Sequence, residues 1–102
     1  MPVWIVGHVP PSYKDCLKKW SIRYFALMER YQHVIRFQTF GHIHPEHYSL
    51  TRSLSTNKAI GVEFIAGNAG CFDQMDPSLR LYEMSSDYHV PVGLQVYKLD
   101  IE

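Results

Sequence analysis

Two histidines, His42 and His44, are separated by one residue at the end of a short apolar segment that begins at Phe37. In an extended backbone residues i and i+2 point to the same side, so both imidazoles would reach one site if the chain stays extended through Ile43. Neutral imidazole is a common ligand of zinc, iron and similar metals. An isolated His-x-His pair is equally compatible with two histidines in an ordinary loop, so a second feature is needed.

The second feature is a Gly7-His8 pair at the end of another short apolar segment, 3–6. A helical pattern separates this pair from Gly41-His42. A strand, a helix and a strand in this order form a βαβ unit, which places the carboxyl ends of both parallel strands at the same edge of the sheet. Open α/β sheets bind ligands at that edge. We therefore expect His8, His42 and His44 to converge on a metal site.

The predicted fold class is α/β, with one βαβ unit followed by further strands. The unit consists of a strand at 3–6, a helix at 15–33 and a strand at 35–40. Additional strands are predicted at 59–66, 79–84 and 90–99, whereas the polar residues at 50–58 indicate a connecting loop.

The predicted helix is amphipathic, because large apolar residues recur at steps of three and four among charged ones. These residues are Leu17, Trp20, Tyr24, Leu27 and Tyr31. We expect this stripe to pack in the core, although it could also form a wall of a substrate site. Asp15 would lie in the first turn, where the helix dipole favours an acidic side chain.

Composition limits the partners that this chain can have. With 10 basic and 10 acidic residues the formal net charge is zero, so overall charge favours neither nucleic acid nor an anionic membrane. A hydrophobic content of 46% indicates a packed globular segment. No apolar run approaches the ~20 residues that a transmembrane helix needs, and no charged leader with a cleavage site is visible.

Several short motifs resemble, in order and spacing, the acid sphingomyelinase-like phosphodiesterases, a branch of the calcineurin-like metallophosphoesterases. The motifs are Gly7-His8-Val9-Pro10-Pro11, Asp15-Cys16-Leu17-Lys18-Lys19-Trp20, Arg30-Tyr31 and Gln38-Thr39-Phe40-Gly41-His42-Ile43-His44, with weaker similarity at 62–66 and 76–82. The resemblance covers nearly the whole chain. It implies that residues 1–102 form a single segment from the later part of a catalytic domain, a partial metallophosphoesterase sandwich.

The resemblance also implies a metal centre with two divalent ions, zinc being the expected metal. His8 and His42 would bind one ion and His44 the other, and Glu46 would not bind metal itself but would orient a ligand histidine. The expected substrate of the complete domain is a sphingomyelin-like phosphodiester or phospholipid. The resemblance implies a secreted or lysosomal location. Cys16 would pair with a cysteine that this chain does not contain, or it is an ordinary buried thiol.

Three further metal-binding motifs of the family, Asp-x-His, Gly-Asp-x-x-Asp and Gly-Asn-His-Asp/Glu, do not occur in this sequence. We therefore expect the isolated chain to bind metal weakly, to contain no catalytic residue of its own and to be inactive. The expected partner is then the part of a complete domain that carries those motifs.

Two alternatives remain. One is a degenerate, non-catalytic relative that acts as an interaction protein or a weak metal-binding protein. The other is a cupin-like barrel, which also carries His-x-His near a strand. It is disfavoured because Tyr48 stands where a cupin has a glutamate and because the long predicted helix does not fit a barrel.

Overall fold

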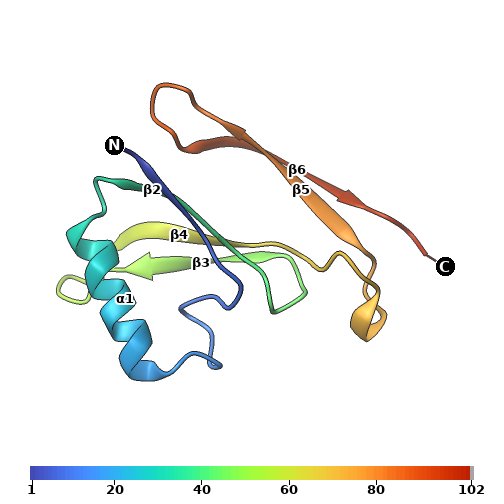
Figure 1. The fold of residues 1–102 in the computed structure, drawn as a ribbon, viewed down its shortest axis with the longest axis horizontal. Coiled ribbons are helices and arrows are strands. Elements are labelled where there is room, and N and C mark those ends of the chain that lie inside the picture. Colours follow the sequence, from blue (N-terminus) through green and yellow to red (C-terminus); the bar gives the residue numbers. More distant parts are fainter. Residues whose placement is uncertain (102) are drawn as a thin grey trace.

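The computed structural model describes residues 1–101, apart from the side chain at position 73. Figure 1 shows the elements in chain order. They are β1 (Val3–Val6), α1 (Lys18–Arg30), β2 (Ile35–Phe40), β3 (His47–Arg52), β4 (Ala59–Ile65), the 3-10 turn η1 (Phe72–Gln74), β5 (Ser78–Met84) and β6 (Pro91–Lys98). The predicted α/β class is confirmed.

The main sheet has four strands in the order β1-β2-β4-β3. β1 runs parallel to β2, with Val6 opposite Thr39, and β2 runs parallel to β4. β3 returns antiparallel to β4. The predicted βαβ unit is therefore present, and β1 lies at one edge of the sheet.

The helix and the β5–β6 hairpin lie on opposite sides of this sheet. Tyr24 of α1 donates a hydrogen bond to the side chain of Gln38 in β2 at 2.6 Å. The neighbouring residue Phe37 must point to the other face, because side chains alternate along a strand. There its ring lies 4.8 Å from that of Tyr82 in β5. In Figure 1 the hairpin stands beside the four-stranded sheet, away from α1.

The helix is shorter than predicted. It spans Lys18–Arg30 rather than 15–33, and Asp15 lies outside it. Two successive turns precede the helix, in which the Tyr13 amide donates to the Pro10 carbonyl and the Cys16 amide donates to the Tyr13 carbonyl, both at 3.0 Å. The expectation that Asp15 is a first-turn helical acid was therefore wrong.

The face of α1 that packs against the sheet also differs from the prediction. Leu17 is 80% exposed and Leu27 is 54% exposed, whereas Ser21 and Met28 are buried. The sheet presents polar side chains to the helix, and Tyr24, a member of the predicted stripe, meets one of them through its hydrogen bond to Gln38. The prediction for this face was therefore right only in part.

One strand was not predicted. β3 begins at His47 and continues through Arg52, so it includes the first residues of the expected 50–58 loop. Its residue Thr51 is fully buried, and a polar residue at a buried strand position gives no apolar alternation to detect. Within residues 1–101, no helix is long and apolar enough to cross a membrane.

Candidate functional site

The two Gly-His segments lie side by side at the carboxyl ends of β1 and β2. The Gly7 amide donates to the Thr39 carbonyl at 3.1 Å, and the Gly41 amide donates to the His8 carbonyl at 2.9 Å. A Cβ atom at Gly7 would come within 2.8 Å of the Phe40 ring, so only glycine fits there without displacing that ring. Parallel pairing thus places His8 and His42 at one edge of the sheet.

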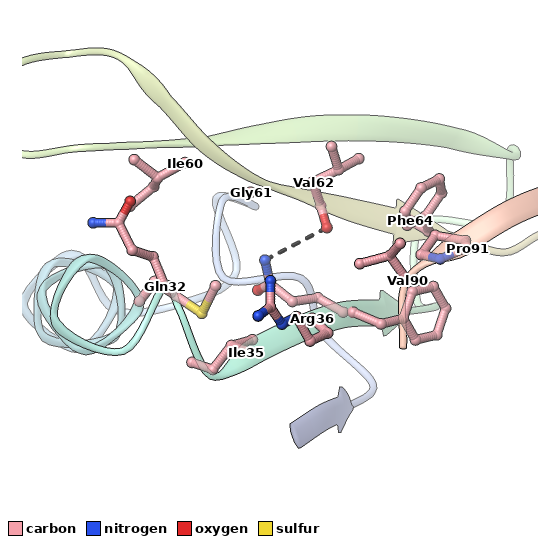
Figure 2. Close-up of a pocket in the computed structure, with 12 residues that line it drawn as sticks. Gln32, Ile35, Arg36, Ile60, Gly61, Val62, Phe64, Val90 and Pro91 are labelled. Carbon is pink, nitrogen blue, oxygen red and sulfur yellow. Dashed lines mark hydrogen bonds between the residues drawn. The ribbon is translucent and has the colours of Figure 1, made fainter. Parts of the chain in front are cut away.

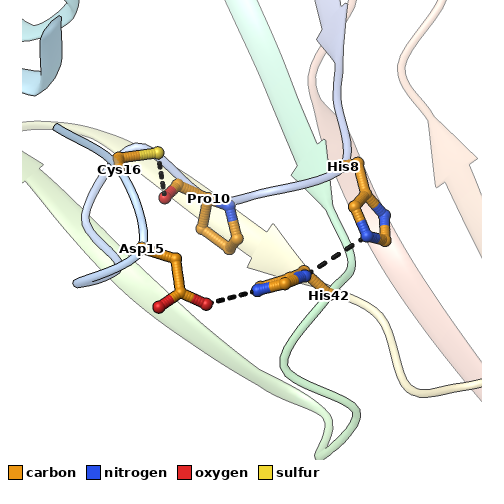
Figure 3. A network of polar contacts seen from close by, with 5 residues as sticks. All are labelled: His8, Pro10, Asp15, Cys16 and His42. Carbon is orange, nitrogen blue, oxygen red and sulfur yellow. Dashed lines mark hydrogen bonds and ion pairs between the residues drawn. The ribbon is translucent and has the colours of Figure 1, made fainter.

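The rings of His8 and His42 approach each other closely. Nε2 of His8 lies 3.3 Å from Nδ1 of His42, and the ring centroids are 5.0 Å apart (Figure 3). Two imidazole nitrogens that bind one tetrahedral zinc ion are about 3.3 to 3.4 Å apart, because each Zn–N bond is about 2.0 to 2.1 Å long. The observed separation fits such a pair of ligands, and it equally fits a hydrogen bond between the rings.

His42 has a second partner that sequence reasoning missed. Its Nε2 atom lies 2.7 Å from Oδ2 of Asp15, so both ring nitrogens are engaged (Figure 3). Asp15 was assigned to the helix, but the turns after Pro10 carry it back over the strand ends. The available signal was the Pro10-Pro11 pair, which excludes a helix at that point.

His44 points elsewhere. Its ring lies 5.4 Å from the ring of Phe72 in η1, at an interplanar angle of 85°. The backbone is not extended between the two histidines of the motif, because φ is 71° at His42 and 80° at His44. Such left-handed conformations are uncommon outside glycine and cost roughly 1 to 3 kcal/mol each. The expected extended path through Ile43 was therefore wrong.

Glu46 is paired with an arginine of the hairpin. Its Oε2 atom lies 3.8 Å from Nη2 of Arg80, and the two side chains are 15% and 6% exposed. The remaining atoms, Oε1 of Glu46 and Nε of Arg80, are buried without a hydrogen bond. This ion pair connects the segment after His44 to β5.

A buried polar network anchors the loop between His8 and α1. The Ser12 hydroxyl donates to Oε2 of Glu63 at 2.7 Å. The Thr51 hydroxyl donates to Oε1 of the same carboxylate at 3.4 Å, and Gln38 donates to Thr51 at 3.3 Å. Glu63 is fully buried, and this burial raises the pKa of its carboxyl group. The network lies between α1 and the sheet, below the loop that carries Asp15.

Two pockets adjoin these elements. One of about 400 Å³ lies between β2 and β4, and the dashed line at Val62 in Figure 2 marks a hydrogen bond to its carbonyl. The donor of this bond is the Gln38 side chain, at 3.4 Å. The other, of about 430 Å³, is mostly apolar and adjoins His8, and its lining includes Leu17, Trp20 and Phe40. The first pocket contains none of the histidines predicted to bind metal.

Among the side chains that the structure describes, no group of three or more His, Cys, Asp or Glu residues is arranged to hold a metal ion. Catalytic zinc ordinarily takes three protein ligands and a water molecule. His8 and His42 together can supply two nitrogen ligands, so their geometry fits part of a ligand set.

Comparison with known proteins gives the relationship of this chain. It is 31% identical to the sphingomyelin phosphodiesterases of Bos taurus and Homo sapiens, in each case over 97% of its length. It is 28% identical to sphingomyelin phosphodiesterase 1 of Caenorhabditis elegans over 80% of its length. An endopolyphosphatase of Cryptococcus neoformans is 40% identical over 48 residues, which is 47% of this chain. No family model matches.

The chain therefore combines an α/β sheet, with two histidines at its carboxyl edge, and similarity to phosphoric ester hydrolases. Among these hydrolases it is related to the sphingomyelin phosphodiesterases, which confirms the resemblance indicated by its motifs. The chain spans 16% of the length of the bovine and human relatives.

Proposed function

We propose that this chain supplies histidine ligands to the metal centre of a phosphodiesterase that acts on a sphingomyelin-like phosphodiester. The observation that carries the proposal is the 3.3 Å approach of His8 and His42 at the ends of parallel strands. The relatives named sphingomyelin phosphodiesterase support the substrate class. Because the chain spans 16% of their length, the activity of a complete enzyme is part of the proposal.

In this proposal His8 and His42 share one divalent ion and His44 serves a second, with zinc as the expected metal. Glu46 holds the segment after His44 in place through Arg80. When bound, such ions lower the pKa of a coordinated water molecule and stabilise charge on the phosphoryl oxygens. The remaining ligands come from motifs that this sequence does not contain.

The number of ligands determines what the isolated chain can do. Two histidines for one ion and one for the other fall short of the three protein ligands that catalytic zinc ordinarily takes. We therefore expect weak zinc binding and no hydrolysis of sphingomyelin or bis-p-nitrophenyl phosphate.

Zinc titration of the chain at pH 7.5, followed by NMR shifts of the histidine rings, tests the ligand assignment. Binding should be lost in His8→Ala and in His42→Ala, and it should persist in the control His33→Ala. Equal affinity in all three variants would contradict the proposal. Turnover above that of His42→Ala would contradict the expected lack of activity.

The alternative is a non-catalytic interaction protein. It is favoured by apolar residues exposed beside the candidate site, including Val6 at 78% and Leu17 at 80%. If zinc affinity does not depend on the histidines, this alternative becomes the better description of the chain.

A further inference from the structure

We infer that Asp15 is a positioning residue that holds the His42 ring with its proton on Nε2, so that Nδ1 is available as a metal ligand beside His8. The inference concerns how His42 acts, and its metal-binding consequence rests on the proposed function. Its basis is geometric, since Oδ2 of Asp15 lies 2.7 Å from Nε2 and the opposite ring nitrogen faces His8 at 3.3 Å (Figure 3).

The tautomer follows from the hydrogen-bonding capacity of each group. An ionised carboxylate only accepts hydrogen bonds, so the nitrogen that faces Asp15 must donate. A neutral imidazole carries one N–H group, which leaves Nδ1 of His42 with a free electron pair. In the metal-free protein His8 Nε2 then donates to that nitrogen. To bind an ion, His8 would carry its proton on Nδ1 instead, so that its Nε2 atom and Nδ1 of His42 would both have free electron pairs.

Metal-binding histidines ordinarily donate their second N–H to a carboxylate, a carbonyl or a water molecule, and this contact fixes the orientation of the ring. Asp15 stands in that relation to His42. The resemblance to the phosphodiesterases assigns no such role to this residue, and its sequence position suggested only a helix terminus.

Burial and hydrogen bonds hold the loop that carries Asp15 against the rest of the fold. Pro10 and Pro11 are buried, and the thiol of Cys16 donates to the Pro10 carbonyl at 3.5 Å. Ser12 is bound to the buried carboxylate of Glu63 at 2.7 Å. Although Asp15 itself is 50% exposed, the residues on both sides of it are tied to the body of the fold.

A simple surface ion pair is the competing interpretation. Exposed pairs contribute little to folding stability, about 0 to 1 kcal/mol. Folding stability therefore does not separate the two interpretations. A positioning role predicts instead that loss of Asp15 changes which nitrogen of the His42 ring carries the proton, and lowers the affinity for metal. The test therefore measures directly which nitrogen of the His42 ring carries the proton.

The experiment compares the wild-type chain with Asp15→Ala, Asp15→Asn and the control Asp87→Ala, an exposed aspartate of the β5–β6 turn. Long-range ¹H–¹⁵N NMR spectra of the metal-free proteins at pH 8.5, where ordinary histidines are neutral, report which ring nitrogen carries the proton. Zinc titration and thermal unfolding are then measured on the same samples.

We expect the wild-type His42 ring to be protonated at Nε2, with a slowly exchanging proton that is lost in Asp15→Ala. Zinc affinity should fall about tenfold or more in that variant, as for other partners of ligand histidines. Asp15→Asn retains an acceptor oxygen and should recover part of both signals, and Asp87→Ala should match the wild type.

A wild-type His42 protonated at Nδ1, or an Asp15→Ala chain with unchanged ring signals, would overturn the inference. If Asp15→Ala and Asp87→Ala lower zinc affinity equally, the inference also fails. Absence of zinc binding in the wild type would instead overturn the proposed function, and the tautomer measurement would still decide the role of Asp15.

Discussion

The hydroxyl group of Ser12 donates a hydrogen bond to the buried carboxylate of Glu63 at 2.7 Å, which joins the loop after His8 to the centre of β4. The same loop carries Asp15, whose carboxylate lies 2.7 Å from His42 Nε2. Ser12 lies outside the motifs that resemble the phosphodiesterases, and Glu63 lies in the 62–66 segment of weaker similarity. We therefore expect the buried network between α1 and the sheet to influence the geometry of the candidate site.

Ser12→Ala should therefore both destabilise the protein and loosen the candidate site. Hydrogen bonds to charged groups contribute about 1.5 to 3 kcal/mol, and the Glu63 carboxylate would lose its shortest one. Urea unfolding should show a fall of this size, together with faster exchange of the His42 ring proton. Ser86→Ala, in the exposed β5–β6 turn, should leave both quantities unchanged.

The buried carboxyl group of Glu63 should make stability depend on pH. Its pKa is raised by burial, and the hydrogen bonds from Ser12 and Thr51 only partly offset this effect. The folded protein then binds the proton more readily than the unfolded chain, so stability should increase as pH falls through the raised pKa. The gain should end near pH 4.3, where the unfolded state is protonated as well.

The difference between wild type and Glu63→Gln isolates this contribution, because the amide does not titrate. Urea midpoints of both proteins are measured between pH 8 and pH 4. Above pH 4.3 the wild-type midpoint should rise more steeply with falling pH than the midpoint of Glu63→Gln. The control Glu83→Gln, on the exposed side of β5, should follow the wild-type curve. Parallel curves for wild type and Glu63→Gln would show that the carboxyl group titrates alike in both states.

Close packing at Gly7 gives a matched pair of substitutions. A Cβ atom there would lie 2.8 Å from the Phe40 ring, whereas at Gly70 it would meet nothing within 4 Å. Overpacking of this kind typically costs about 1 to 3 kcal/mol. Gly7→Ala should lower the unfolding midpoint and shift the His8 ring signals, and Gly70→Ala should do neither. Similar effects in both variants would mean that Phe40 moves aside freely.

The sequence was sufficient to predict the βαβ unit and the approach of His8 to His42. Both follow from local patterns, since two short apolar segments that end in Gly-His must place those ends together once their strands pair in parallel. The rules for strand pairing and for right-handed crossover connections were enough to make both predictions. The same reasoning failed at His44, because an extended path was assumed where the backbone takes positive φ angles.

Other features depend on contacts distant in sequence. The turns after Pro10 bring Asp15 to His42, but the Ser12–Glu63 hydrogen bond that ties this loop to β4 spans 51 residues, and no local pattern reveals that bond. The buried face of α1 was predicted only in part: Tyr24 contacts Gln38 of the sheet, but the buried Ser21 is polar and leaves no trace in apolar periodicity. β3 escaped detection for the same reason, since its buried residue Thr51 belongs to the polar network.

The last prediction concerns the ion pair between Glu46 and Arg80, which connects the segment after His44 to the hairpin. Both side chains are largely buried, Nη1 of Arg80 also donates to the Tyr82 hydroxyl at 3.2 Å, and one atom on each partner already lacks a hydrogen bond. Removal of one partner leaves a buried charge, so Arg80→Met should destabilise the protein by about 3 kcal/mol, the lower end of the range for such pairs.

The double variant Glu46→Gln/Arg80→Met removes both charges and should recover part of the loss. Arg23→Met, on the exposed side of α1, serves as the control. Urea unfolding of the four chains provides the measurement. A double variant no more stable than Arg80→Met would mean that the Arg80 side chain stabilises the fold through its packing rather than through its charge.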